Sequence, residues 1–113
     1  MSAYCCAKAG LAMFTQVAAL EFAPRNIRVN AVSPGFVNTP LTELVTLAPG
    51  VLEDYLENTP IGRVGEAKDV ADAVLYLCSD KASWLTGEVL DINGGAHLRR
   101  YPDIHGHVVR AFE

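Results

Sequence analysis

Tyr4 and Lys8 are the residues in this chain whose types and spacing most favour chemistry. Residues four apart in a helix lie one turn above each other on the same face. A lysine ammonium in that position stabilises the phenolate form of the tyrosine, and the positive end of the helix dipole acts in the same direction. Such a pair could give and accept a proton near neutral pH. The same spacing is also typical of a surface pair whose lysine stem lies along the ring, so the interpretation depends on the rest of the chain.

A long helix over residues 3–22 is predicted to carry this pair, with Ser2 as its cap and Pro24 just beyond its end. Between residues 9 and 20 this helix has no charged side chain, although a helix on the outside of a monomer normally has a charged face. The helix must therefore be buried within the chain or packed against another subunit. Because so little chain is available to cover it, we expect a homo-oligomer formed through helix 3–22 and the 67–95 region.

The rest of the chain follows a β–α–β order. Residues 27–33 predict a strand that stops at Pro34-Gly35, residues 67–79 a helix, and residues 88–93 a second strand. A crossover of this kind predicts two parallel strands and an α/β fold. Residues 38–60 are expected to form a lid over a site at the carboxyl end of the first strand, although a plain connecting pair of helices is the alternative.

Composition limits the possible functions. At 113 residues, half of them apolar, the chain is expected to be a single domain. A net charge of −4 argues against nucleic-acid and membrane-surface partners. The apolar stretches are predicted to be too short to span a bilayer. No signal peptide is visible, and the three cysteines read as reduced thiols of a cytoplasmic protein. A metal site formed by the three histidines His97, His105 and His107 is a weak alternative, so no metal is expected.

Several short motifs together resemble the short-chain dehydrogenase/reductase family over residues 2–95. They are Tyr4-x-x-x-Lys8, the run from Ile27 through Pro34-Gly35 to Thr39, Pro60-Ile61-Gly62-Arg63, Thr86-Gly87 and Asn93-Gly94-Gly95. The resemblance implies the carboxyl-terminal part of a Rossmann-like, doubly wound parallel sheet. Residues 1–113 would then be a partial domain of this family, with 38–60 as the substrate lid and 96–113 as a carboxyl-terminal tail.

The resemblance also implies roles for individual residues. Tyr4 would be the general acid and base at a small-molecule carbonyl or alcohol, and Lys8 would support Tyr4 and hydrogen-bond the nicotinamide ribose of NAD or NADP. Pro34 and Gly35 would belong to the cofactor loop. The backbone of Val37 and the side chain of Thr39 would hold the nicotinamide carboxamide and a nearby phosphate.

One expected feature of the family is missing from these residues. None of the nine glycines falls in a dinucleotide-binding spacing, and Ser2 is too close to Tyr4 to be the serine that polarises the carbonyl. We therefore expect the chain alone to be an incomplete, inactive part of an NAD(P)-dependent oxidoreductase. The alternative is a non-catalytic protein that associates with full-length relatives as an oligomerisation partner.

Overall fold

The computed structural model describes all residues from 1 to 113. In chain order the elements are α1 (Ser2–Phe22), a 3-10 turn (Ala23–Arg25), β1 (Ala31–Pro34), α2 (Pro40–Val45), α3 (Val51–Glu57), α4 (Ala67–Cys78), a second 3-10 turn (Asp80–Ala82), β2 (Val89–Ile92), a third 3-10 turn (Ala96–Leu98) and α5 (Ile104–Ala111). They form two compact units. Unit 1 comprises Met1–Ser33 and Asp72–Asp91, and unit 2 comprises Pro34–Ala71 and Ile92–Glu113.

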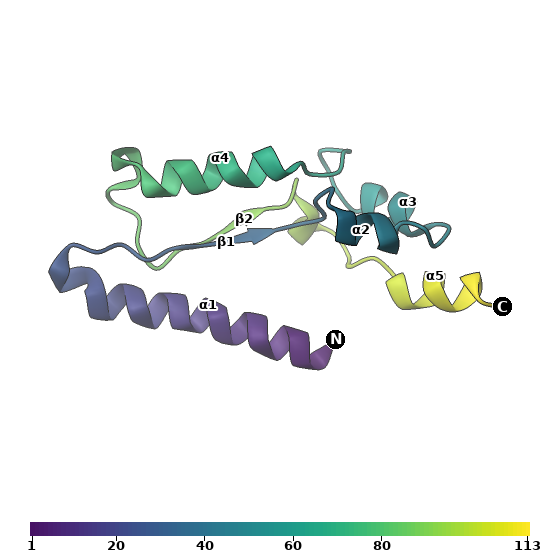
Figure 1. Ribbon diagram of the computed structural model, residues 1–113, viewed down its shortest axis with the longest axis horizontal. Helices are drawn as coiled ribbons and strands as arrows, with labels where there is room; N and C mark the ends of the chain where they lie inside the picture. The colour runs from purple at the N-terminus through teal and green to yellow at the C-terminus, as the bar shows by residue number, and fades with distance from the viewer. The chain divides into compact units, whose positions relative to one another are not determined.

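The two strands are parallel, as predicted. The Ala31 N–H donates to the carbonyl of Glu88 at 2.8 Å, and four residues further along both strands the Gly35 N–H donates to the carbonyl of Ile92 at 2.9 Å. Pairing that advances in the same direction on both strands is the parallel pattern. In unit 1 the strands run between α1 and residues 72–78 of α4 (Figure 1). This arrangement is the expected α/β fold.

Both strands are shorter than predicted, because the side chain of Asn30 takes the place of regular pairing. Its amide nitrogen donates to the Leu85 carbonyl at 3.0 Å, and its amide oxygen accepts from the Glu88 N–H at 3.0 Å. The Val29 N–H likewise donates to a side chain, the Thr86 hydroxyl, at 3.1 Å. Residues 29 and 30 are therefore hydrogen-bonded to residues 85–88 of the same chain without belonging to β1.

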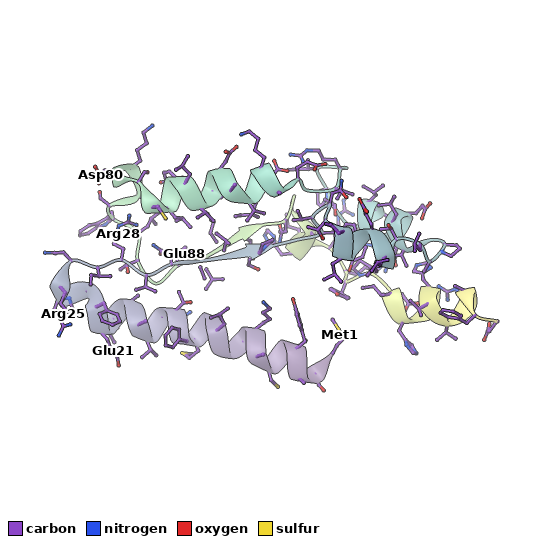
Figure 2. All side chains as sticks on the ribbon, viewed as in Figure 1. Met1, Glu21, Arg25, Arg28, Asp80 and Glu88 are labelled. Atoms are coloured by element: carbon purple, nitrogen blue, oxygen red, sulfur yellow. The ribbon has the colours of Figure 1, made fainter.

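Helix α1 differs from the prediction at its first residue. Met1 is the N-cap residue and Ser2 is already helical, with no side-chain hydrogen bond that caps the helix, so the expected capping by Ser2 is wrong. The carboxyl-terminal end is as expected, since the helix stops at Phe22 and Pro24 lies in the 3-10 turn that follows. Glu21 and Arg25 lie at this end of the helix, away from Met1 (Figure 2).

The surface of α1 is strongly apolar, as the sequence predicted. Only Thr15, Ala18 and Ala19 are buried. The exposed face carries Leu11, Met13, Phe14, Val17 and Leu20. Residues Ser2–Arg25 are also long and apolar enough to cross a membrane, with a mean hydropathy of 1.2. The expectation that every apolar stretch is too short to span a bilayer was therefore wrong for this helix. The core helix of a soluble protein meets the same criteria of length and composition.

Each unit has a small core. In unit 1 the buried apolar residues are Ala18, Ala19, Leu77 and Ala82, and in unit 2 Val51 of α3 is completely buried. Trp84, on the connection that leads to β2 in unit 1, is by contrast 99% exposed. The carboxyl-terminal residues form helix α5, which the sequence did not predict, and the Asp103 carboxylate caps it by accepting from the Gly106 N–H at 3.0 Å.

Candidate active site

Tyr4 and Lys8 lie together on α1, as their spacing predicted. The Lys8 ammonium nitrogen is 5.5 Å from the centre of the Tyr4 ring, which is the geometry of a cation–π contact. Tyr4 is 59% exposed, so its hydroxyl is open to solvent and to a reactant. The Lys8 ammonium lies over the Tyr4 ring, and this contact leaves its N–H donors available for hydrogen bonds.

The 34–39 loop lies in unit 2 and is held by a close contact with the turn after β2. A methyl group on Gly35 would be 2.6 Å from Cβ of Asn93 and 2.8 Å from its Cα. Asn93 is itself fixed, because its amide oxygen accepts from the Gly95 N–H at 3.0 Å and lies 3.1 Å from a ring nitrogen of His97. Only glycine therefore allows the loop to leave β1 along this path.

Val37 presents its backbone at the free side of this loop. It forms a parallel bridge with Gly65, in which the Gly65 N–H donates to Phe36 and the Asn38 N–H donates to Gly65. In a parallel bridge of this kind the N–H and carbonyl of Val37 itself point to the opposite side. The Val37 carbonyl accepts from the Thr42 hydroxyl at 2.7 Å. An amide ligand at this edge would thus meet one backbone donor and one acceptor.

Thr39 begins helix α2 through a reciprocal capping arrangement. Its hydroxyl oxygen accepts from the Thr42 N–H at 3.2 Å, and its own N–H donates to the Thr42 hydroxyl at 2.8 Å. The Thr39 hydroxyl is therefore oriented toward the helix start. It retains further hydrogen-bonding capacity, because a hydroxyl has one donor and two acceptor positions.

The 38–60 segment contains two short helices, α2 and α3. Pro40 is at the first turn of α2, and Gly50 precedes α3 with a φ of +84°, a left-handed conformation that favours glycine. The Tyr55 ring of α3 stacks on the Phe36 ring with a centre-to-centre distance of 4.1 Å. This stack connects the segment to the 34–39 loop.

Unit 2 also contains a charged cluster that the sequence did not reveal. Asp54 of α3 is buried and has an ion pair with Arg100 at 2.7 Å and a contact with His107 at 3.1 Å. These partners are 46 and 53 residues away in sequence, and no local pattern indicates such a pairing. Burial raises the pKa of Asp54, but hydrogen bonds from Asp103, Arg100 and His107 outweigh it and lower the pKa below its ordinary value.

The structure thus groups the predicted site residues in two sets. Tyr4 and Lys8 lie together in unit 1, whereas Pro34, Gly35, Val37 and Thr39 follow one another along one loop whose positions belong to unit 2. No group of three histidine, cysteine or acidic side chains is arranged to hold a metal ion. His97 and His107 instead contact Asn93 and Asp54.

Residues 1–97 match the sequence family described as enoyl-(acyl carrier protein) reductase. The chain is 49% identical over 92 residues to the 3-oxoacyl-[acyl-carrier-protein] reductase of Aquifex aeolicus, which covers 81% of this chain and 36% of that relative. It is 48% identical over 95 residues to the Haemophilus influenzae reductase of the same name, covering 84% of this chain and 38% of the relative. The chain therefore spans little more than a third of the length of these relatives.

Solved structures give the same result. A short-chain type dehydrogenase/reductase from Mycobacterium ulcerans superposes with a TM-score of 0.86 at 37% identity, over 93% of this chain and 38% of that one. A putative 2-deoxy-D-gluconate 3-dehydrogenase from Agrobacterium tumefaciens with bound NADP gives a TM-score of 0.82 at 36% identity, over 85% of this chain and 39% of that one. The fold, the parallel strands and these matches agree. The chain belongs to the short-chain dehydrogenase/reductase family of oxidoreductases.

Proposed function

We propose that this chain supplies the acid–base and nicotinamide-facing part of an NAD(P)-dependent oxidoreductase that interconverts a carbonyl and an alcohol. The pairing of Tyr4 with Lys8 on one face of α1, in the part of the chain that matches the family, carries the proposal. In the direction of alcohol oxidation, Tyr4 would accept the proton of the substrate hydroxyl. In reduction the Tyr4 hydroxyl returns that proton to the carbonyl oxygen.

Lys8 would act on both the tyrosine and the cofactor. Its ammonium lies over the Tyr4 ring and has three donors, one of which could bind the nicotinamide ribose. Its position over an exposed ring leaves these donors free to turn toward a ligand. The chemistry needs the charge and the reach of lysine, so a neutral side chain of similar length would not replace it.

The 34–39 loop would hold the nicotinamide. Pro34 and Gly35 set the path of the loop, and the outward N–H and carbonyl of Val37 match the carbonyl and amino groups of a carboxamide. The Thr39 hydroxyl could add a hydrogen bond to a phosphate oxygen. The residues fit a nicotinamide cofactor, which supplies or accepts the hydride when it is bound.

The 38–60 segment would be the substrate lid, within a single partial domain that has residues 96–113 as its tail. The names of the similar proteins refer to substrates as different as 3-oxoacyl-[acyl-carrier-protein] and 2-deoxy-D-gluconate. This variety supports a carbonyl or alcohol as the reacting group and favours no particular substrate.

A chimera tests the proposal directly. In this chimera, the segment of the Aquifex aeolicus reductase that matches this chain is replaced by the corresponding residues of this chain. Reduction of a 3-oxoacyl thioester is measured as the loss of NADPH absorbance. We expect activity that falls about 100-fold or more in Tyr4→Phe, since a positioned acid or base contributes 10²–10⁴-fold. Tyr76→Phe is the matched control, because Tyr76 is also an exposed helical tyrosine. Equal activity of Tyr4→Phe and the unmodified chimera would refute the role of Tyr4.

The exposed apolar face of α1 supports a second candidate function, a non-catalytic partner of other family members. Phe14 is 66% exposed and Leu20 78%, which favours a contact with another subunit. Pull-down of a full-length relative by this chain, and its loss in Phe14→Glu, would support this function. An active chimera would instead favour the catalytic one.

A further inference from the structure

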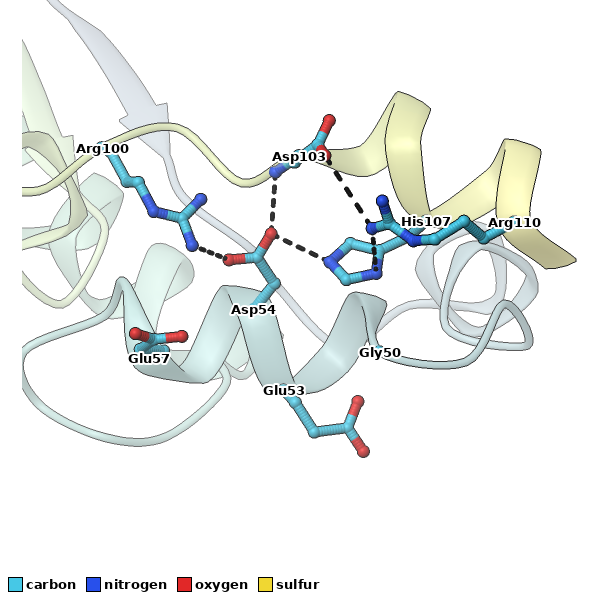
Figure 3. A pocket seen from close by; sticks show the side chains of 8 residues that line it. All are labelled: Gly50, Glu53, Asp54, Glu57, Arg100, Asp103, His107 and Arg110. Atoms are coloured by element: carbon cyan, nitrogen blue, oxygen red, sulfur yellow. Dashed lines mark hydrogen bonds and ion pairs between the residues drawn. The ribbon is translucent and has the colours of Figure 1, made fainter.

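The carboxylate of Asp54 is buried among hydrogen-bond donors, and Figure 3 shows its contacts with Arg100, Asp103 and His107. Its Oδ1 accepts from Arg100 Nη2 at 2.7 Å and from Asn58 Nδ2 at 3.0 Å. Its Oδ2 accepts from the Asp103 N–H at 2.7 Å and lies 3.1 Å from His107 Nε2. A carboxylate has about four acceptor positions, so each is used. Its side chain is only 6% exposed, which makes these contacts strong and expensive to lose.

Three of these four donors come from the end of the chain. Arg100, Asp103 and His107 all lie beyond residue 97, where the family match stops. Asp54 itself lies within the matched region, in helix α3 of the 38–60 segment. The cluster therefore attaches residues that follow the family match to a helix of the proposed lid. It does so within unit 2, to which all these residues belong.

The orientation of the His107 ring is fixed on both sides. Arg110 Nη2 is 3.2 Å from Nδ1 of His107, and an arginine can only donate, so Nδ1 is the acceptor. The proton of the neutral ring is then on Nε2, which donates to Asp54. Gly50 makes room for the ring, since a methyl group there would be 2.8 Å from Nδ1 of His107. The charged groups that line the same pocket as the ring are Glu53, Asp54 and Glu57 of α3, together with Arg100, Asp103 and Arg110.

A second contact continues from the same helix to the 34–39 loop. Tyr55, next to Asp54, stacks on Phe36 at 4.1 Å. Burial, followed by a hydrogen-bonding contact with Tyr101, raises the pKa of Tyr55. The carboxyl-terminal residues thus contact α3 through two adjacent side chains, one of which touches the loop that would hold the nicotinamide.

We propose that residues 98–111 are a strap that the Asp54 carboxylate locks onto helix α3, and that the strap holds α3 and the stacked Phe36 in place. The role of the 38–60 segment as a lid rests on the proposed function, whereas the attachment of residues 98–111 to α3 does not depend on it. When the strap is released, α3 loses its fixed position first, and the stack with Phe36 loosens with it. The strap therefore sets how readily the 38–60 segment opens.

Hydrogen exchange of the full chain, measured by mass spectrometry, tests this inference without cofactor or turnover. We expect His107→Ala to accelerate amide exchange in α5 and in α3 about tenfold or more, because hydrogen bonds to charged groups have the required strength. Arg100→Ala should give a smaller effect in the same two helices, since Arg100 is 57% exposed. Asp54→Asn should exceed both.

Two of the variants have a matched control from the same neighbourhood. His105→Ala and Arg99→Ala alter exposed neighbours of His107 and Arg100, and we expect exchange within twofold of wild type. If Asp54→Asn fails to fold, His107→Ala and Arg100→Ala decide the question. Unchanged exchange in α5 of His107→Ala would overturn the strap. Faster exchange in α5 with unchanged exchange in α3 would also overturn it, because the tail would then rest on α3 without holding it. Failure of the chimera described above would leave this result unaffected.

Discussion

Replacement of Gly35 by alanine tests the contact between the two strand ends. The added methyl carbon would be 2.6 Å from Asn93 Cβ and 2.8 Å from Asn93 Cα, whereas carbon atoms pack at about 3.5–4.0 Å. The gap must widen by roughly 1 Å, and the neighbour is backbone that cannot turn away. Overpacking of this kind costs about 1–3 kcal/mol. We expect this loss from steric crowding, since Gly35 does not have the left-handed φ seen at Gly50.

Amide exchange at Ile61 is a suitable measurement, because its N–H donates at 3.1 Å to the carbonyl of Gly94, next to Asn93. A loss of about 1–3 kcal/mol accelerates exchange roughly 5- to 150-fold. Gly10→Ala is the matched control. A methyl group at Gly10 meets no atom within 4 Å, and alanine is better than glycine inside a helix by about 1 kcal/mol, so α1 should become more stable. Exchange at Ile61 within twofold of wild type in Gly35→Ala would refute the reasoning.

Three further predictions follow from the described geometry. Asp69 accepts two hydrogen bonds from Arg63, at 2.7 and 2.9 Å, and one from the Glu66 N–H at 2.7 Å. The hydrogen bonds from Arg63, and next the one from Glu66, lower the pKa of Asp69. The contribution of the Asp69 carboxylate to stability is therefore fully present above the ordinary aspartate pKa near 4, and it is lost as the pH falls through the lowered pKa. Asp69→Asn should therefore accelerate exchange at the start of α4 at pH 7, severalfold at most because the pair is exposed, and a constant difference down to pH 1 would contradict this. The 113-residue chain should bind NADH more weakly than micromolar in calorimetry, since it has no glycine-rich phosphate turn, and micromolar affinity would be the contrary result. The chain should also self-associate at low micromolar concentration, because a two-stranded sheet leaves strand edges unpaired, and a sharp monomer peak in light scattering would contradict that expectation.

Local signals in the sequence predicted most elements of the fold. The uncharged run between residues 9 and 20 and the Pro34-Gly35 stop are both local signals. The structure has an exposed apolar face at the first and the end of β1 at the second. The strand lengths were less predictable. The β-rich residues 27–30 suggested pairing, but the side chain of Asn30 makes the hydrogen bonds instead.

The candidate site was predictable only where its residues are close in sequence. Tyr4 and Lys8 are one helical turn apart, so their contact follows from the period of the helix. The partners of Asp54 are about fifty residues away, and a single sequence has no pattern that joins such positions. Helix α5 was missed for a related reason, since its contacts with α3 are polar and long-range and its own sequence has the glycine Gly106 in its first turn.

The exposure of Trp84 gives the chain an intrinsic optical signal. It is the only tryptophan and is 99% exposed, at the end of unit 1 where its neighbours include Ile27 and Arg28. An indole in water emits at long wavelength and is readily quenched by iodide. Any molecule that covers this end of unit 1 must shift that emission toward the blue and shield the ring from the quencher. Fluorescence of the unlabelled chain therefore reports whether this surface is covered, with no need for an introduced dye.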